Sequence, residues 1–461
     1  MPLAAVFQFD PNDEGIELMK AVLHLQGFAL YTQIYNDQPP LFTIALSRWL
    51  GVFGPSIVAA RLLTLSFSTL LVWAFCQTLR FYLGNLLALI GTILLIISCN
   101  FLRLSVSVMV GLPALALAML AIYGLTLYKQ YSSRLALIAS GALLALSLQT
   151  KLFTALIVVV IIYDVVQFRL AQLPQKQSIR ILVIDLATWL ATLTGVFLVV
   201  GLWCHSLSYS QLINSHFDPL VKTAFDAASS YQLIGAFLLQ DFDYLLLAIL
   251  ATIALWQTQR WLQLLPLVWL LAGFLLLLLH RPVWYHHYLL ISLPLTWLAT
   301  SGVALSFEAF RQWRSLGQAA SRRSRLAALC VIFSICLVPI KLGATQLENQ
   351  RVLTQSPDYR QLVTALLPQQ RSPQWLFTDC PMVAFYAGLE VPPEIAVLPF
   401  IRIESKAITP AQLLAIFEKY YPKQVLLCKS SLLRDTVQDY LQQHYAKFYE
   451  NNVGSVYRRK F

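Results

Sequence analysis

Long apolar segments separated by short polar ones dominate the chain. A helix needs about 20 apolar residues to cross the core of a bilayer, and ten segments approach that length. We expect membrane-spanning helices at 57–79, 83–99, 108–128, 134–149, 151–168, 181–204, 243–257, 262–280, 287–307 and 326–344. The pattern therefore predicts an all-α polytopic membrane domain. Its fourth and fifth spans, and its seventh and eighth, follow so closely that each pair forms a tight hairpin.

The composition supports a membrane protein. Of 461 residues, 58% are hydrophobic and only 12% are charged, and the mean hydropathy is +0.65. Soluble domains usually carry about 25% charged residues. With half the usual share of charged residues, a chain of this size cannot cover its surface with charged side chains as a soluble protein does. This excludes a cytosolic enzyme, a disordered chain and a disulfide-rich scaffold.

The net charge of +11 marks topology rather than a nucleic-acid partner. A nucleic-acid-binding protein gathers Lys and Arg on one soluble face, whereas here they lie mainly in alternate short loops. These basic loops contain Arg80, Lys129, Arg134, Arg169, Lys176, Arg180, Arg260 and the cluster at 311–325. Because short cytoplasmic loops are the basic ones, we expect residues 1–56, 205–242 and 281–286 and the C-terminal region to face outward. The 311–325 cluster could also contact anionic lipids.

A second domain is predicted at 345–461, where charges return and the apolar runs become short. Strands are expected at 375–379 and 424–428, helices at 409–419 and 432–443, and a closing hairpin at 444–450 and 453–459. Strands that alternate with helices indicate a small α/β domain. We expect it to cap the membrane domain at 1–344 or to bind an acceptor. Cys380 and Cys428 fall in this outward region, where a disulfide is chemically permitted.

Residues 1–56 form an outward segment with two short amphipathic stretches before the first span. Two such helices would lie along the membrane surface, with Pro39-Pro40 forcing an extended link between them. The segment has no recognisable signal peptide. Either a first span is missing from this chain, or the later spans carry the segment across.

Several short motifs occur here in a recognisable order. They are Asp13-Glu14-Gly15, Gly27-x-x-Leu30-Tyr31, Asn36-Asp-Gln-Pro-Pro-Leu41, Phe53-Gly54 and Ala59-Ala60-Arg61-Leu62, with looser matches at Gln149-Thr150-Lys151 and His286-His287-Tyr288. This order resembles membrane glycosyltransferases of the GT-C fold. It is most similar to the family-39-like branch, which includes relatives of protein O-mannosyltransferases and lipid A aminoarabinose transferases.

The resemblance implies an activity. Such enzymes move a sugar from a polyprenyl-phosphate carrier to a lipid, polysaccharide or protein acceptor on the outer face of the membrane, with inversion. The first outward loop supplies a carboxylate that acts as general base on the acceptor hydroxyl, and Asp13 matches it. The resemblance implies no nucleotide-binding domain. We expect no cofactor and no metal, because a cluster of cations can neutralise the leaving phosphate.

Two further acids are candidates for the site. Glu14 would orient Asp13 or bind acceptor, and Asp37 would contact the sugar. From the residues alone, Asp13 and Glu14 could equally serve the first turn of a helix, and Asp37 could be a turn residue beside the prolines.

The leaving group is a phosphate, so cations should gather near Asp13. The candidates are Arg103, Lys151, Arg281, His286 and His287. Arginine grips phosphate in a bidentate manner and histidine can donate to it. The alternatives are a lysine that reaches to the interface, an interfacial aromatic belt at 281–288, and an arginine that merely flanks its loop. One departure from many relatives is Val108-Met-Val-Gly-Leu-Pro113, which lacks an acid.

Other interpretations stay open. Asp241-Phe-Asp243 resembles the metal-binding motif of nucleotide-sugar transferases, but helix capping is the simpler explanation. A transporter or flippase of a lipid-linked or small polar substrate would carry inverted repeats and charges at mid-membrane; no repeat is evident, and the suspect charges lie at span ends. A non-catalytic scaffold would make Asp13 dispensable.

Overall fold

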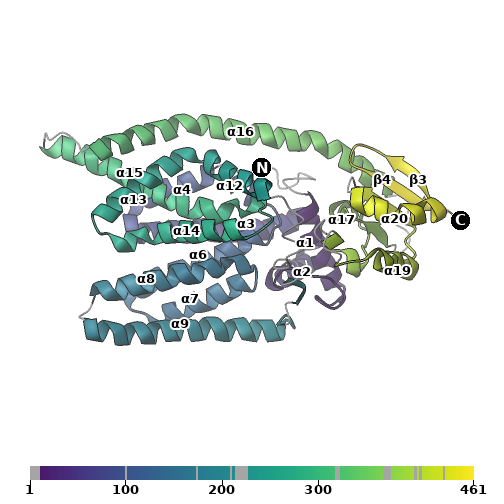
Figure 1. Ribbon diagram of the computed structural model, residues 1–461, viewed down its shortest axis with the longest axis horizontal. Helices are drawn as coiled ribbons and strands as arrows, with labels where there is room; N and C mark the ends of the chain where they lie inside the picture. Colours follow the sequence, from purple (N-terminus) through teal and green to yellow (C-terminus); the bar gives the residue numbers. More distant parts are fainter. Residues whose placement is uncertain are drawn as a thin grey trace.

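The computed structural model describes residues 11–98, 101–172, 175–207, 210–212, 227–316, 322–366, 375–398, 402–403, 407–428 and 431–460. A helical bundle forms one end of the molecule and a small α/β domain the other, and two short helices lie between them (Figure 1). The predicted fold class, a polytopic helical domain with a small α/β domain, is confirmed.

Each predicted span corresponds to a helix. The bundle contains α3 (Ile57–Leu83), α4 (Asn85–Ile97), α6 (Gly111–Tyr131), α7 (Arg134–Leu148), α8 (Leu156–Gln172), α9 (Gln175–Trp203), α13 (Phe242–Gln257), α14 (Leu265–Leu279), α15 (Leu289–Leu316) and α16 (Arg322–Leu366). Three 3-10 turns precede bundle helices: η1 (Leu152–Ala155), η2 (Trp261–Leu264) and η3 (Tyr285–Tyr288). The sequence did not predict α12 (Ala227–Gln240), which meets α13 at a bend of 79°.

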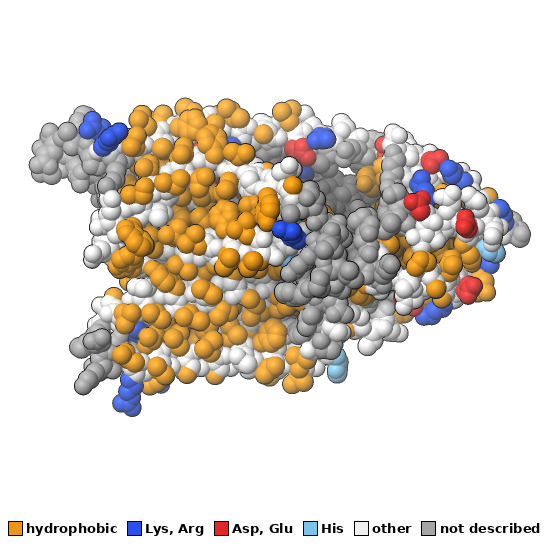
Figure 2. Space-filling model, in the orientation of Figure 1, with side chains coloured by type: hydrophobic (Ala, Val, Ile, Leu, Met, Phe, Trp, Pro, Cys, Tyr) orange, Lys and Arg blue, Asp and Glu red, His pale blue; other side chains and the backbone are white. Residues whose placement is uncertain are grey.

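The bundle is built to lie in a bilayer. Within the described ranges, seven helices are long and apolar enough to cross a membrane, and the bent α12–α13 pair makes up to eight. The helices α4 and α7 are apolar but shorter, with 13 and 15 residues. Hydrophobic side chains cover the visible face of the bundle, whereas acidic side chains gather toward the α/β domain (Figure 2). The protein is therefore an integral multi-pass membrane protein.

Buried and half-buried ion pairs connect the bundle helices at the end remote from the α/β domain. Lys129 on α6 contacts Asp164 on α8 at 2.7 Å, and Arg169 on α8 contacts Asp185 on α9 at 2.7 Å. A buried charge that loses its partner is strongly destabilising, so these pairs fix the helices relative to one another. Two residues that the sequence analysis used only as markers of topology, Lys129 and Arg169, thus also hold the bundle together.

Two short helices, α1 (Pro11–Leu25) and α2 (Leu41–Phe53), form the layer between the domains (Figure 1). The helix α1 is buried on two sides. Met19 and Leu23 pack in the core of the α/β domain, whereas Leu18 and Ala21 pack with α2 and the start of α3. One short helix therefore joins the two domains through apolar contacts.

The α/β domain has a four-stranded sheet in the order β1-β2-β4-β3. Its elements are β1 (Leu376–Thr378), α17 (Pro381–Ala387), η5 (Pro393–Ile395), α19 (Pro410–Tyr420), β2 (Gln424–Cys428), α20 (Ser431–His444), β3 (Tyr445–Glu450) and β4 (Gly454–Arg459). The β1–β2 pair is parallel, and the other two pairs are antiparallel. The strands, helices and hairpin expected from the sequence are all present. Thr409 caps α19, as its position before Pro410 suggests, because its side chain accepts the Gln412 N–H.

The two domains share the 45-residue helix α16, which runs from the bundle to the α/β domain (Figure 1). Its end supplies Leu362 and Leu366 to the core of that domain. The boundary predicted at 344/345 falls inside this helix.

Candidate active site

Helix α1 presents its acids in two directions. Asp13 and Glu17, four residues apart, lie on one helical face, and both carboxylates act electrostatically on Lys151. Glu14 points elsewhere and is fully buried. The side chain of Asp13 is 42% exposed, so it is the more accessible of the two adjacent acids.

A close packing contact holds the first turns of α1 in place. A Cβ atom added at Gly15 would lie 2.3 Å from the backbone nitrogen of Met382, at the start of α17. No side chain fits at that distance, so the glycine lets the α/β domain approach the turn that carries Asp13.

Glu14 is occupied by structural contacts. Its two carboxylate oxygens accept from Arg61 on α3, at 3.2 and 2.8 Å, and one of them also accepts the Val108 N–H at 2.9 Å. Both side chains of the ion pair are fully buried. Glu14 therefore fastens α1 to α3 and to the loop before α6, in which the sequence lacks an acid.

Lys151 stands in the turn between α7 and η1, and 8% of the residue is exposed. The Leu41 N–H at the start of α2 donates to the Gln149 carbonyl at 3.0 Å, which ties this turn to the outer layer. Burial lowers the pKa of Lys151 to about 8, although the nearby Asp13, Glu17 and Asp37 oppose the shift. Its ammonium lies 5.2 Å from the centre of the Phe153 ring and makes no ion pair within 4.0 Å in the described part of the chain. It is a buried cation among acids.

The turn η3 brings two histidines to the same place. Nδ1 of His286 lies 3.6 Å from a carboxylate oxygen of Asp13. His287 is buried, and its Nδ1 accepts the Trp284 N–H at 3.1 Å. The rings of the two histidines pack at 4.5 Å. Thus His286 faces the acid directly, while His287 shapes the turn that presents it.

The other two predicted cations pair with residues other than Asp13. Arg281 donates to the Tyr231 hydroxyl at 2.9 Å. Arg103, on the short helix α5 (Phe101–Leu104), is 5% exposed and lies 3.8 Å from Glu348 of α16. Burial lowers the pKa of Arg103, and Glu348 partly opposes this shift. Arg103 therefore also connects the loop before α6 to the helix that leads into the α/β domain.

The α/β domain contributes a cation that no sequence motif predicted, Arg402. The guanidinium of Arg402 lies 3.9 Å from the centre of the Tyr35 ring and donates 2.7 Å hydrogen bonds to two carbonyls, those of Glu394 and Val397. Burial lowers its pKa to about 10, opposed in part by Tyr35 and Asp37. Asp37 thus has a cation from each domain nearby, Lys151 and Arg402. A sequence signal for this contact was absent, because Arg402 lies far from any of the motifs.

The pair Asp241 and Asp243 neither caps a helix nor forms part of a metal-ligand cluster among the described residues. Lys341 on α16 lies 2.7 Å from both carboxylates, and the Tyr288 hydroxyl donates to Asp241. The expectation of helix capping was wrong because a buried lysine, 100 residues away in sequence, neutralises these acids instead.

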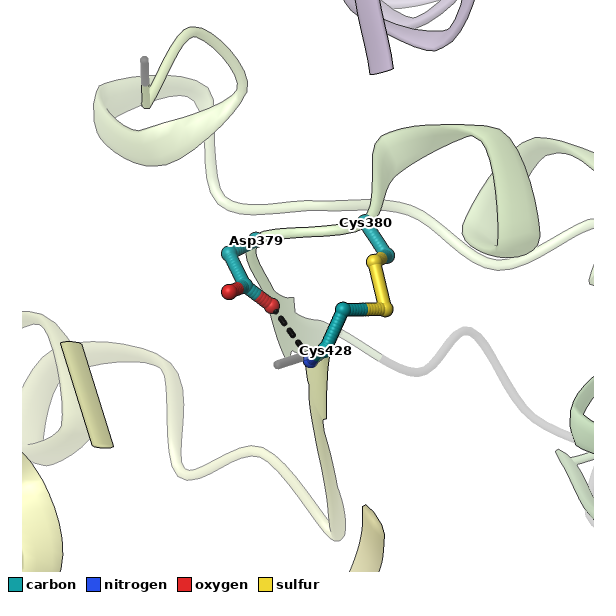
Figure 3. A group of neighbouring side chains, drawn as sticks. All are labelled: Asp379, Cys380 and Cys428. Atoms are coloured by element: carbon teal, nitrogen blue, oxygen red, sulfur yellow. Dashed lines mark hydrogen bonds between the residues drawn. A yellow bond between two sulfur atoms is a disulfide. The ribbon is translucent and has the colours of Figure 1, made fainter. Parts of the chain in front are cut away.

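One group of possible metal ligands occurs among the described residues, and it lies in the α/β domain: Asp379, Cys380 and Cys428. The two cysteines form a disulfide, as the sequence permits, and their sulfurs are therefore not free thiolates (Figure 3). Asp379 accepts the Cys428 N–H at 2.7 Å, and burial raises its pKa to about 7. The disulfide joins Cys380, the residue before α17, to Cys428 at the end of β2.

Comparisons with known proteins agree on the fold. No family model matches the chain, and no curated protein does. Among solved structures, ArnT from Cupriavidus metallidurans bound to undecaprenyl phosphate is similar over 99% of this chain and 95% of its own, with a TM-score of 0.66 and 11% identity. The oligosaccharyltransferase of Archaeoglobus fulgidus, in its apo form, is similar over 90% of this chain and 66% of its own, with a TM-score of 0.54 and 12% identity. Both neighbours have the GT-C fold. The resemblance found in the sequence is confirmed at this level, and the chain is a membrane protein of the GT-C fold.

Proposed function

We propose that the protein is an integral-membrane glycosyltransferase that transfers a sugar from a polyprenyl-phosphate carrier to a lipid, glycan or protein acceptor, with inversion. The observation that carries the proposal is the partly exposed carboxylate of Asp13, with Lys151 and His286 beside it, at the end of an apolar bundle. The solved neighbours support it, since one of them is ArnT bound to undecaprenyl phosphate.

Asp13 is the general base in this proposal. A base must reach the proton that it removes and be ionised at the working pH. The nearby ammonium of Lys151 favours its ionised form, and its 42% exposure leaves a side open to an acceptor hydroxyl. Proton removal strengthens the hydroxyl as a nucleophile, which attacks the anomeric carbon from the side opposite the phosphate.

Lys151 acts on the leaving group as a cation, and in this proposal the neutral ring of His286 donates a hydrogen bond to it. As the glycosidic bond breaks, negative charge builds on the phosphate oxygen, and a cation placed there stabilises the transition state. Lys151 is buried, so its charge is only weakly screened and acts more strongly than it would in water. Arg103, His287 and Arg281 then hold the surrounding loops, and Glu14 positions α1 through Arg61.

The location of the site fits a lipid-carried donor. Its residues lie where the apolar bundle meets the outer layer of α1 and α2, so the isoprenoid chain can stay in the membrane while the sugar reaches Asp13. We place this end on the extracytoplasmic side of a plasma or inner membrane, because the basic loops favour a cytoplasmic position for the other end and a disulfide suits an oxidising compartment.

The test uses purified protein in detergent with a polyprenyl-phosphate sugar and candidate acceptors. Release of free polyprenyl phosphate, detected by mass spectrometry, is expected from the wild type and is expected to be nearly lost in Asp13→Asn. A transporter would move the intact lipid across vesicles without cleaving it. Intact donor in every condition, with lipid movement in vesicles, would contradict the transferase and favour that rival.

A further inference from the structure

A groove of about 610 Å³ lies in the bundle between α4, α13, α15 and α16, and none of the proposed catalytic residues lines it. Most of its lining is apolar. Ile93, Ile332 and Ile335 line it and are 48%, 58% and 64% exposed. The groove is therefore open on the side that faces the membrane.

The dimensions fit a hydrocarbon chain. On α16 the lining extends from Ala328 to Lys341, a distance of about 20 Å at 1.5 Å per residue. This is about two thirds of a hydrocarbon core of about 30 Å.

The end of the groove nearer the α/β domain is polar. Lys341 lies 2.7 Å from Asp241 and from Asp243, and its ammonium is 3.8 Å from the centre of the Tyr244 ring. Two carboxylates and one ammonium leave a net charge of −1. Asp243 is 1% exposed, and its Oδ2 accepts no hydrogen bond from the described residues.

A buried carboxylate oxygen without a donor is costly. Because Asp243 lines the groove, a bound molecule can supply the missing donor. The net negative charge disfavours a headgroup that consists of phosphate alone, such as that of a polyprenyl phosphate. It favours a headgroup that carries an ammonium or another hydrogen-bond donor.

We propose that this groove binds a bilayer phospholipid with a primary-amine headgroup, of the phosphatidylethanolamine type. One acyl chain occupies the apolar part, and the ammonium donates to Oδ2 of Asp243. The bound lipid also supports the proposed active site, because the same ion cluster holds Tyr288, two residues after His286. The site is separate from the donor phosphate site of the proposed function.

Native mass spectrometry of the delipidated full-length protein tests this proposal. Phosphatidylethanolamine and phosphatidylcholine with the same acyl chains are added at equal concentrations; they differ only in methylation of the amine, which removes its N–H donors. A charge-assisted hydrogen bond predicts retention of phosphatidylethanolamine about tenfold above phosphatidylcholine. Asp243→Asn should remove most of this preference.

A second variant guards against misfolding of the first. Ile332→Trp fills the apolar part of the groove and leaves the ion cluster unchanged. Leu275→Trp is its control, because Leu275 and Ile332 are both 58% exposed but only Ile332 lines the groove. We expect Ile332→Trp to reduce lipid retention and Leu275→Trp to leave it unchanged. Equal retention of the two lipids by the wild type, or equal retention by both tryptophan variants, would overturn the proposal. Neither readout depends on glycosyl transfer.

Discussion

Neighbouring acids in the first outward segment have separate roles. Asp13 is 42% exposed and faces a histidine, whereas Glu14, the next residue, is buried against Arg61. The sequence motif predicted both as candidates because it contains both. It could not separate them, since the difference depends on which helical face meets α3. Lys151 was predicted from its position between apolar segments, whereas Arg402 had no local signal.

The pKa of Lys151 predicts a pH dependence. Burial lowers it from 10.5 to about 8, so its ammonium is charged below pH 8 and loses its proton as the pH rises through that value. With the proposed function, donor affinity is then lost, and the KM for a polyprenyl-phosphate sugar should rise between about pH 7 and 9.5. Lys151→Arg keeps its charge and should flatten this profile. A flat KM profile in the wild type would contradict the role given to Lys151.

The Glu14–Arg61 pair makes a prediction about stability. Removing one partner from a buried pair costs about 3–5 kcal/mol, so Glu14→Gln should lower the free energy of unfolding by about this amount, measured by denaturant titration in detergent. The double variant with Arg61→Met should recover part of the loss, because no charge is left unpaired. Asp435→Asn, at an exposed acid of α20, is the control and should change little. Equal stability of Glu14→Gln and the control would show that Glu14 does not stabilise the fold.

At the scale of elements, the apolar pattern predicted every span of the bundle and every strand of the sheet. It did so because long apolar runs and short β-rich runs are local signals. It missed α12, which lies in the region assigned to the 205–242 loop, and it divided α16 at residue 344. Tertiary packing decides such features: Leu362 and Leu366 extend α16 into the core of the next domain.

A substitution at Gly15 tests the contact between α1 and α17. Alanine at this position would place a Cβ atom 2.3 Å from the Met382 nitrogen, so the two helices must move apart and displace Asp13. We expect Gly15→Ala to lower both the melting temperature and transferase activity. Gly343→Ala is the matched control, since nothing lies within 4 Å of a Cβ there; alanine should leave activity unchanged and stabilise the helix by up to about 1 kcal/mol. Similar activity in the two variants would show that the contact does not hold the site.

At the scale of the whole molecule, the α/β domain is part of the site's framework. It shares a core with α1, supplies Arg402 beside Asp37, and receives the end of α16. The sequence indicated a cap or an acceptor-binding domain from composition alone. The shared core could not be foreseen, because it depends on side chains that are more than 300 positions apart.

The Cys380–Cys428 disulfide is expected to stabilise the α/β domain. It closes a segment with a sequence separation of 48 residues, for which chain entropy gives about 4 kcal/mol. Replacing both Cys380 and Cys428 with Ala should destabilise the α/β domain by up to this amount, seen by limited proteolysis and thermal unfolding. The pair Cys76→Ala and Cys336→Ala, at free cysteines of the bundle, is the control. If both double variants unfold alike, the bond contributes nothing to the domain.

In the proposed mechanism, Asp13 removes the proton of the acceptor. The most direct measurement is steady-state transfer from a polyprenyl-phosphate sugar by the wild type, Asp13→Asn and the control Asp435→Asn. Losing a general base should lower kcat about 10²–10⁴-fold, with the KM for the donor within a few-fold of the wild type and Asp435→Asn unaffected. Transfer by Asp13→Asn at the wild-type rate would show that Asp13 is not the general base.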